Sequence, residues 1–170
     1  MRKSLIYSLF FIFFITLDSF LKYYVFHNIP MMSWQYPFFP FGGIPVFDFF
    51  NISFSINHVE NTGAAWGMFS SFSKLLLMIR IVIIFFLFVY FVAFLKDRSK
   101  ELPYLLVIIG AFGNIIDYFV YGKVIDMLHF RFFNYSFPIF NLADSLISIG
   151  IFWLVINIGV KKIKRVQDAN

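Results

Sequence analysis

The sequence contains no cysteine and few charged residues, and each shortage excludes a class of protein. Without cysteine, the 170-residue chain has no disulfide, no thiolate metal site and no cysteine nucleophile. Charged residues make up only 14% of the chain, whereas a soluble domain carries about a quarter. Because 61% of the residues are hydrophobic and 28 are Phe, too little polar surface remains to cover a water-soluble protein. We therefore expect a membrane protein.

Four apolar stretches each approach the roughly 20 residues that cross a bilayer as a helix. They cover residues 5–26, 75–95, 102–120 and 141–160. Basic residues lie at the ends of these stretches: Arg2, Lys3, Lys96, Arg98, Lys100, Lys161, Lys162, Lys164 and Arg165. The positive-inside rule then places both termini and the link between the second and third stretches in the cytoplasm. The connections 27–74 and 121–140 are predicted to face outward, and residues 1–170 to form a single integral membrane domain.

The first outward connection is predicted to contain a strand and a loop. Residues 51–57 alternate between apolar and polar side chains, a period of two that is typical of a strand with one apolar face. The run NTGAAWGMF follows at 61–69, and its Gly63 and Ala64 would let the backbone approach another group closely. The predicted fold class is therefore an all-α membrane protein, with four transmembrane helices and a small extracytoplasmic β/loop cap.

Ionisable residues inside apolar helices are costly, so each one is a candidate functional residue. Asp18 and Lys22 lie four residues apart on the first helix, share a face and can pair. A structural ion pair and a direct part in a functional site are equally open from the sequence. Arg80 lies in the second stretch, and we expect its side chain to extend outward to the membrane surface.

Further polar residues lie where the third stretch ends and the fourth begins. Asn114 and Asp117 are three residues apart, as are Asn141 and Asp144, so each pair shares a helix face. Asp126 lies between the two pairs in a short run predicted to be extended. The predicted topology places Asp126 and Asp144 at the same outer boundary, where they can meet. Asp117 is a rival partner, with a structural role at the helix end as its alternative.

Two carboxylates in a low-dielectric site tend to share one proton, because both cannot easily ionise. One can then act as a base on water and the other as an acid toward a carbonyl or an amine, as in peptide hydrolysis. His27, His58 and His129 are scattered over the outward connections without the spacing of metal ligands. We expect no metal and no cofactor. A transporter or proton pathway and a non-enzymatic scaffold remain open as alternatives.

Four segments together resemble the signal peptidase II family, the lipoprotein signal peptidases. They are DSFLK at 18–22, NTGAAWGMF at 61–69, GNIIDY through KVID at 113–126, and FNLADS at 140–145. The most specific part is the combination of GNxxD, a nine-residue step to VID, and FNxAD. The segments follow the family's order relative to the four apolar stretches, and the resemblance covers nearly the whole chain.

The resemblance implies roles for the matching residues. Asp126 and Asp144 match the family's catalytic aspartates. Eight further positions match residues that bind substrate or support the site: Asp18, Lys22, Asn61, Gly63, Ala64, Asn114, Asp117 and Asn141.

The chain departs from the family pattern at two positions. The family commonly has Arg where this chain has Tyr118, and Gln where it has Ser19. Neither departure affects the two candidate catalytic residues. Arg80, Arg131 and Lys123 are the candidates to compensate for the missing arginine.

The resemblance also implies an activity and its setting. It implies an intramembrane aspartyl endopeptidase that removes the signal peptide from diacylglyceryl-modified prolipoproteins, cleaving just before the lipidated Cys. The implied partners are those precursors and membrane lipids, with no nucleic acid, and the implied state is a monomer. The implied location is the bacterial cytoplasmic (inner) membrane, with both termini cytoplasmic and the active site near the outer face.

Overall fold

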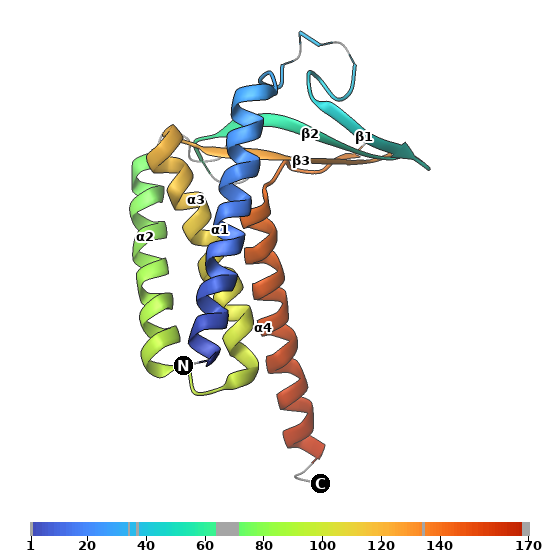
Figure 1. Cartoon of the computed structure of the whole chain (residues 1–170). Coiled ribbons are helices and arrows are strands. Elements are labelled where there is room, and N and C mark those ends of the chain that lie inside the picture. Colours follow the sequence, from blue (N-terminus) through green and yellow to red (C-terminus); the bar gives the residue numbers. More distant parts are fainter. Residues whose placement is uncertain (1, 34, 37, 64–71, 134, 168–170) are drawn as a thin grey trace.

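The computed structural model describes residues 2–33, 35–36, 38–63, 72–133 and 135–167, with side chains described between residues 4 and 160 of these ranges. Within them, four helices are long and apolar enough to cross a membrane, as the sequence predicts. The helical elements are α1 (Arg2–Asn28), α2 (Ser73–Val89) with its π-helical extension η3 (Tyr90–Phe94), the short 3-10 turn η4 (Arg98–Lys100), α3 (Glu101–Tyr121) and α4 (Leu142–Gln167). The helices form a bundle, and α1 begins and α4 ends at the end farther from the sheet (Figure 1).

Helix α3 is the centre of the bundle and packs against each of the other three helices. Small residues allow its closest approach to α4. A Cβ atom at Gly110 would overlap the carbonyl oxygen of Ala143, and one at Gly150 would lie 2.7 Å from the carbonyl oxygen of Pro103. The α3–α4 contact therefore brings the two backbones together, and it fixes the position of the first turn of α4.

Replacing Gly110 by Ala tests this contact. The added Cβ meets a backbone carbonyl that cannot rotate away, so we expect the variant to lose about 1–3 kcal/mol of unfolding free energy. Thermal unfolding in detergent measures the loss. The matched control is Gly159→Ala on α4, where a Cβ meets nothing within 4 Å and higher helix propensity favours the change. Equal stability of the two variants would contradict the proposed close contact.

The described residues form a four-stranded antiparallel sheet that lies across one end of the bundle (Figure 1). Its strands, in spatial order, are β1 (Ile44–Phe49), β2 (Ile52–Asn61), β3 (Val124–Phe132) and β4 (Tyr135–Ser136). The strand predicted at 51–57 is present as β2 and is longer, and the extended run predicted around Asp126 is present as the longer strand β3. The pairing of strands from both connections in one sheet was not predicted, so "all-α" describes the fold too narrowly.

Strand β2 buries its polar face and leaves its apolar face partly exposed, which is the reverse of a strand in a soluble protein. Its polar side chains Ser53, Ser55 and Asn57 are at most 1% exposed, whereas its apolar side chains are only half-buried. Asn57 donates a hydrogen bond to the carbonyl of Pro40, so the loop before β1 covers the polar face. On the other face, Phe54 stacks on Phe130 of β3 with ring centroids 4.4 Å apart.

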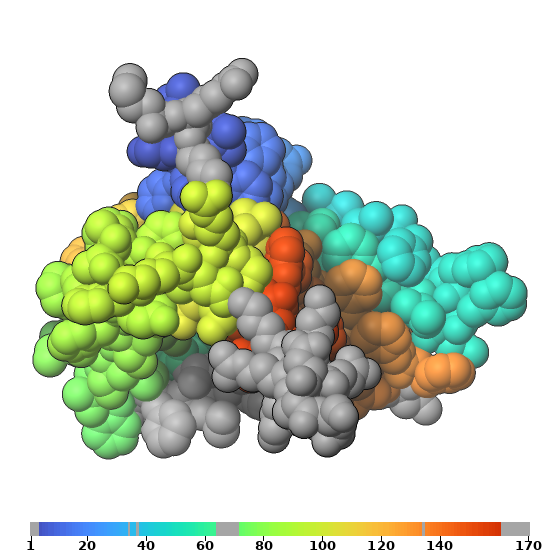
Figure 2. Space-filling view, turned by 90° about the horizontal axis from the view of Figure 1, so that it is seen from below, coloured from blue at the N-terminus to red at the C-terminus, as the bar shows by residue number. Residues whose placement is uncertain are grey.

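This sheet extends sideways beyond the helices, as the view from the opposite end of the bundle shows (Figure 2). Large aromatic side chains remain exposed on its outer part, including Phe49, Phe132 and Phe133. A water-soluble protein rarely leaves such a cluster uncovered. Aromatic side chains in this setting are typical of the membrane–water interface.

Candidate active site

The two candidate catalytic residues come from different parts of the fold. Helix α3 ends at Tyr121, and the next residue, Gly122, has a positive φ of 73° that stops the helix and turns the chain into β3. Asp126 is the third residue of β3, opposite Val59 of β2. The chain then returns alongside β3, where Phe140 pairs with Leu128, and α4 starts directly afterwards. Asp144 is therefore in the first turn of α4, beside the strand that carries Asp126.

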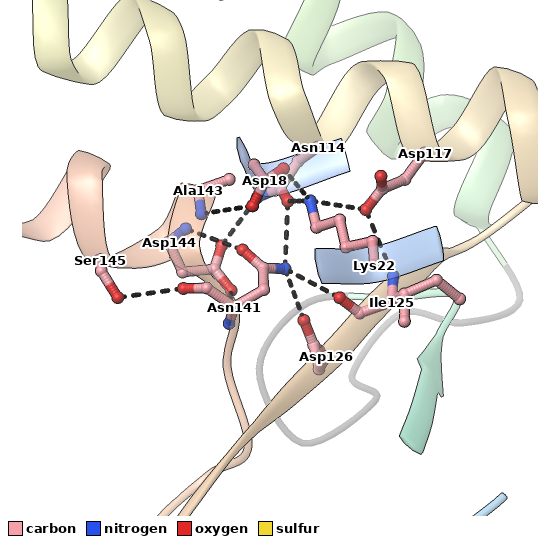
Figure 3. Close-up of polar contacts among 10 residues, drawn as sticks. All are labelled: Asp18, Lys22, Asn114, Asp117, Ile125, Asp126, Asn141, Ala143, Asp144 and Ser145. Carbon is pink, nitrogen blue, oxygen red and sulfur yellow. Dashed lines mark hydrogen bonds and ion pairs between the residues drawn. The ribbon is translucent and has the colours of Figure 1, made fainter. Parts of the chain in front are cut away.

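Asn141 links the two acids. Its side-chain amide donates a hydrogen bond of 2.7 Å to Oδ1 of Asp126. It also precedes α4 and caps it: its Oδ1 accepts from the backbone N–H of Asp144 at 2.9 Å, and its own N–H donates to Oδ2 of Asp144 at 3.3 Å. This reciprocal arrangement is a capping box with Asp in place of Glu. One asparagine thus contacts both carboxylates (Figure 3).

Asn114 supports the same pair from α3. Its amide nitrogen donates to Oδ1 of Asp144 at 2.7 Å, and its oxygen accepts from Asn141 at 3.2 Å and from Lys22 at 3.1 Å. Because the oxygen has two donors, the amide has a single sensible orientation. Asn114 therefore holds Asp144 in place.

A buried ion cluster lies behind the asparagines. Nζ of Lys22 lies 2.6 Å from Asp18 and 2.7 Å from Asp117, and all three side chains are at most 2% exposed. Asp18 also accepts from the N–H of Ala143 in the first turn of α4, and Asp117 accepts from the N–H of Ile125 in β3. The cluster thus joins α1, α3, α4 and β3. Asp117, the rival partner, pairs with Lys22 and a backbone amide rather than lining the cavity beside the two acids.

The two acids line one cavity of about 250 Å³ between the bundle and the sheet. Its described lining residues are Asn61, Gly63, Arg80, Asn114, Val124, Asp126, Phe137, Pro138, Ile139, Phe140 and Asp144. A second cavity of about 220 Å³ also reaches Asp126 and Asn61. A molecule in the first cavity can therefore contact both carboxylates at once.

The surroundings of Asp126 favour its protonated form. Burial raises the pKa of Asp126 to about 7, and the negative charge of Asp144 acts in the same direction. Hydrogen bonds from Asn61 and Asn141 partly oppose the rise. Near neutral pH this carboxyl can therefore hold a proton or release one.

The structure places the remaining predicted site residues in different ways. Asn61 donates to Oδ2 of Asp126 at 3.0 Å and accepts from the N–H of Gly63 at 2.9 Å. Ala64 lies outside the described residues. The side chain of Arg80 was expected to extend to the membrane surface, and this was wrong. It lines the cavity and donates to the carbonyl of Gly63 at 2.9 Å, because this buried carbonyl needs a donor that water does not supply.

His58 and His129 lie in the two connections, as the sequence predicts, but on strands β2 and β3 and at most 5% exposed rather than at an open interface. Among the described residues, no group of three or more His, Asp or Glu side chains is arranged to hold a metal ion.

The segment from Phe137 to Phe140 forms the apolar wall of the first cavity and was not predicted from the sequence. Its only local signal is an aromatic and proline-containing run immediately before FNLADS. The backbone amide of Ala143 was not predicted as a partner of Asp18. The bond from the amide of Ile125 to Asp117 agrees with the structural role considered for Asp117 at the helix end.

Known proteins resemble this chain in sequence and in structure. A lipoprotein signal peptidase of Thermodesulfovibrio yellowstonii is 43% identical over 66% of this chain and 72% of that protein. One from Bartonella henselae is 34% identical over 88% of this chain and 85% of that protein. A solved bacterial membrane enzyme superposes with a TM-score of 0.77 and 27% identity, covering 92% of this chain and 88% of the other. The model of the family described as signal peptidase (SPase) II matches residues 10–160, and this chain therefore belongs to the signal peptidase II family.

Proposed function

We propose that Asp126 and Asp144 are the catalytic pair with which this signal peptidase II removes signal peptides from prolipoproteins. The family membership supports the protease activity and the lipoprotein precursor as substrate. One observation carries the aspartyl mechanism: both carboxylates line the same cavity, and Asn141 contacts both. The alternative of a transporter or proton pathway has no comparable support.

The geometry suits general acid–base hydrolysis of a peptide bond. Asp126, with its raised pKa, would hold the shared proton, and Asp144 would take a proton from the attacking water. The water oxygen bonds to the scissile carbonyl carbon while Asp126 donates its proton to the carbonyl oxygen. When the C–N bond breaks, the proton taken up by Asp144 passes to the leaving amine, and a hydroxyl of the intermediate returns a proton to Asp126 as the new carbonyl forms. Asn114 and Asn141 hold the acids in position throughout.

The substrate's lipid group would help to position the scissile bond. We propose that the precursor carries a diacylglyceryl group on its Cys and is cleaved just before that residue. Acyl chains held in the bilayer would fix the depth of the lipidated Cys. The scissile bond would then be held beside the two acids before the reaction starts. Phe137 and Phe140 in the cavity wall provide apolar contact for such a substrate.

We also propose how the helix bundle is oriented in the membrane. The basic residues of the link between η3 and α3 lie at the end of the bundle where α1 begins and α4 ends (Figure 1). The positive-inside rule makes this the cytoplasmic side of the bacterial inner membrane and places the sheet and acids at the outer face. We propose a single membrane domain that acts as a monomer.

The pH dependence of cleavage tests the shared proton. Asp126 is protonated below its pKa of about 7 and ionised above it, so the one-proton pair is lost as pH rises through about 7. Of the charged groups near Asp126, Asp144 raises its pKa and Lys22 lowers it. We expect kcat/KM to fall above about pH 7. Asn61→Ala removes a hydrogen bond that lowers this pKa, so the alkaline limb should move to higher pH. A flat profile, or the opposite movement, would count against the proposal.

A further inference from the structure

Arg80 brings a positive charge from α2 to the cavity that holds the two acids. Among the described residues that line this cavity it is the one basic residue. The other two candidates to replace the missing arginine are engaged elsewhere. Lys123 pairs with Glu60 at 2.6 Å, and the guanidinium of Arg131 lies over the ring of Phe39, 4.6 Å from its centroid.

A continuous chain of hydrogen bonds connects Arg80 to Asp126. Nη2 of Arg80 donates to the carbonyl of Gly63 at 2.9 Å, and the N–H of Gly63 donates to Oδ1 of Asn61 at 2.9 Å. The amide nitrogen of Asn61 then donates to Oδ2 of Asp126 at 3.0 Å. Gly63 is buried, so its carbonyl depends on a protein donor in place of water.

This chain completes the support of Asp126. Asn141, fixed by the start of α4, holds Oδ1 of Asp126, whereas Asn61 holds Oδ2. Asn61 is at the end of β2, where the chain leaves the sheet, so its side chain needs a further anchor. A charged guanidinium bonded to a backbone carbonyl is a strong anchor.

We propose that Arg80 is a positioning residue for Asp126, acting from α2 through Gly63 and Asn61. The inference rests on the proposed catalytic role of Asp126. Arg80 contacts neither carboxylate: it fixes the turn at residues 61–63, which keeps the amide of Asn61 directed at Oδ2. Without it, Asp126 keeps its bond to Asn141 alone and loses its fixed orientation toward Asp144.

A double-mutant cycle between Arg80→Met and Asn61→Ala tests the path. The full chain is reconstituted in lipid vesicles, and kcat and KM are measured for a synthetic diacylglyceryl-modified precursor peptide. We expect Arg80→Met to lower kcat about tenfold, because the loss of one hydrogen bond to a charged group changes a rate by about that factor. KM should change less than about twofold. In the Asn61→Ala background the same substitution should change kcat less than about twofold, because the path is already broken.

Three outcomes of the cycle would overturn the inference. A tenfold loss in both backgrounds would show that Arg80 acts by another route. A rise in KM with unchanged kcat would show that it contacts the substrate, and an unchanged kcat would show no role. Asp126→Asn is assayed in parallel: if that variant stays active, the proposed catalytic pair fails, whatever the cycle shows.

Two further variants control for charge and folding. Lys74→Met removes a charge from an exposed site on the first turn of the same helix and should leave kcat unchanged. Arg80→Lys keeps a donor and the charge on a stem as long as that of Met, so it should regain at least about a third of the lost kcat. If Arg80→Met fails to fold, Arg80→Lys carries the cycle. A lysine variant as slow as the methionine variant would contradict the proposal.

Discussion

Replacing either Asp126 or Asp144 by Asn should lower the rate of precursor cleavage roughly a thousandfold, while membrane insertion stays intact. Asn has the shape of Asp, but it can neither take a proton from water nor supply one to the scissile carbonyl, and general acid–base steps contribute factors of this size. The measurement is single-turnover cleavage of a diacylglyceryl-modified precursor by the purified full chain.

The control for this pair of variants is Asp48→Asn. Asp48 lies on β1, exposed and outside both cavities that reach Asp126, so its loss should leave the rate unchanged. The two site variants should also be non-additive, because neither acid works without the other. Near-normal processing by both single variants would refute the aspartyl mechanism while leaving the family assignment intact.

Replacing Lys22 by Met should have the largest effect on stability. The side chain of Lys22 is fully buried and lies within 2.7 Å of two carboxylates. Removing it leaves Asp18 and Asp117 buried without their cation, and breaking a buried pair in this way costs about 3–5 kcal/mol. Chemical or thermal unfolding in detergent should show the loss, together with a loss of activity, because the cluster fixes the start of α4.

A neutral cluster separates the effect of charge from that of packing. In the triple variant Asp18→Asn, Lys22→Met, Asp117→Asn no uncompensated charge remains, so most of the lost stability should return. If the triple variant were as unstable as Lys22→Met alone, the defect would come from the lost lysine contacts. If Lys22→Met unfolded like the parent chain, the cluster would not hold the bundle together.

The sequence was sufficient to predict the bundle and insufficient to predict the sheet. Hydrophobic runs of the length of a bilayer identify helices because the lipid imposes that length. Strand β1 contains Pro45 and a register shift between Pro45 and Phe47, and the expected loop pattern of prolines and glycines hid it. The alternation in β2 was visible, but not which face is buried, because that choice depends on whether lipid, water or a loop covers each face.

The residues of the candidate site could be predicted from the sequence, but the hydrogen bonds between them could not. Asn114 and Asn141 stood out by spacing, yet only the fold shows that Asn141 serves both acids. The choice of Asp126 over Asp117 depended on the family resemblance, and the structure supplies a physical reason: Asp117 is held by Lys22. Arg80 was misjudged because its partner is a backbone carbonyl from another segment, which leaves no pattern in the sequence.

The two proposed catalytic acids belong to different bodies of the molecule. Asp126 is carried by a strand of the sheet, whereas Asp144 is carried by α4, which is long and apolar enough to cross a bilayer. In the proposed membrane orientation, the headgroup region would set the depth of the sheet, and hydrophobic mismatch would set the tilt of α4. Because Asn141 contacts both acids, bilayer thickness would act on the catalytic pair through this one side chain.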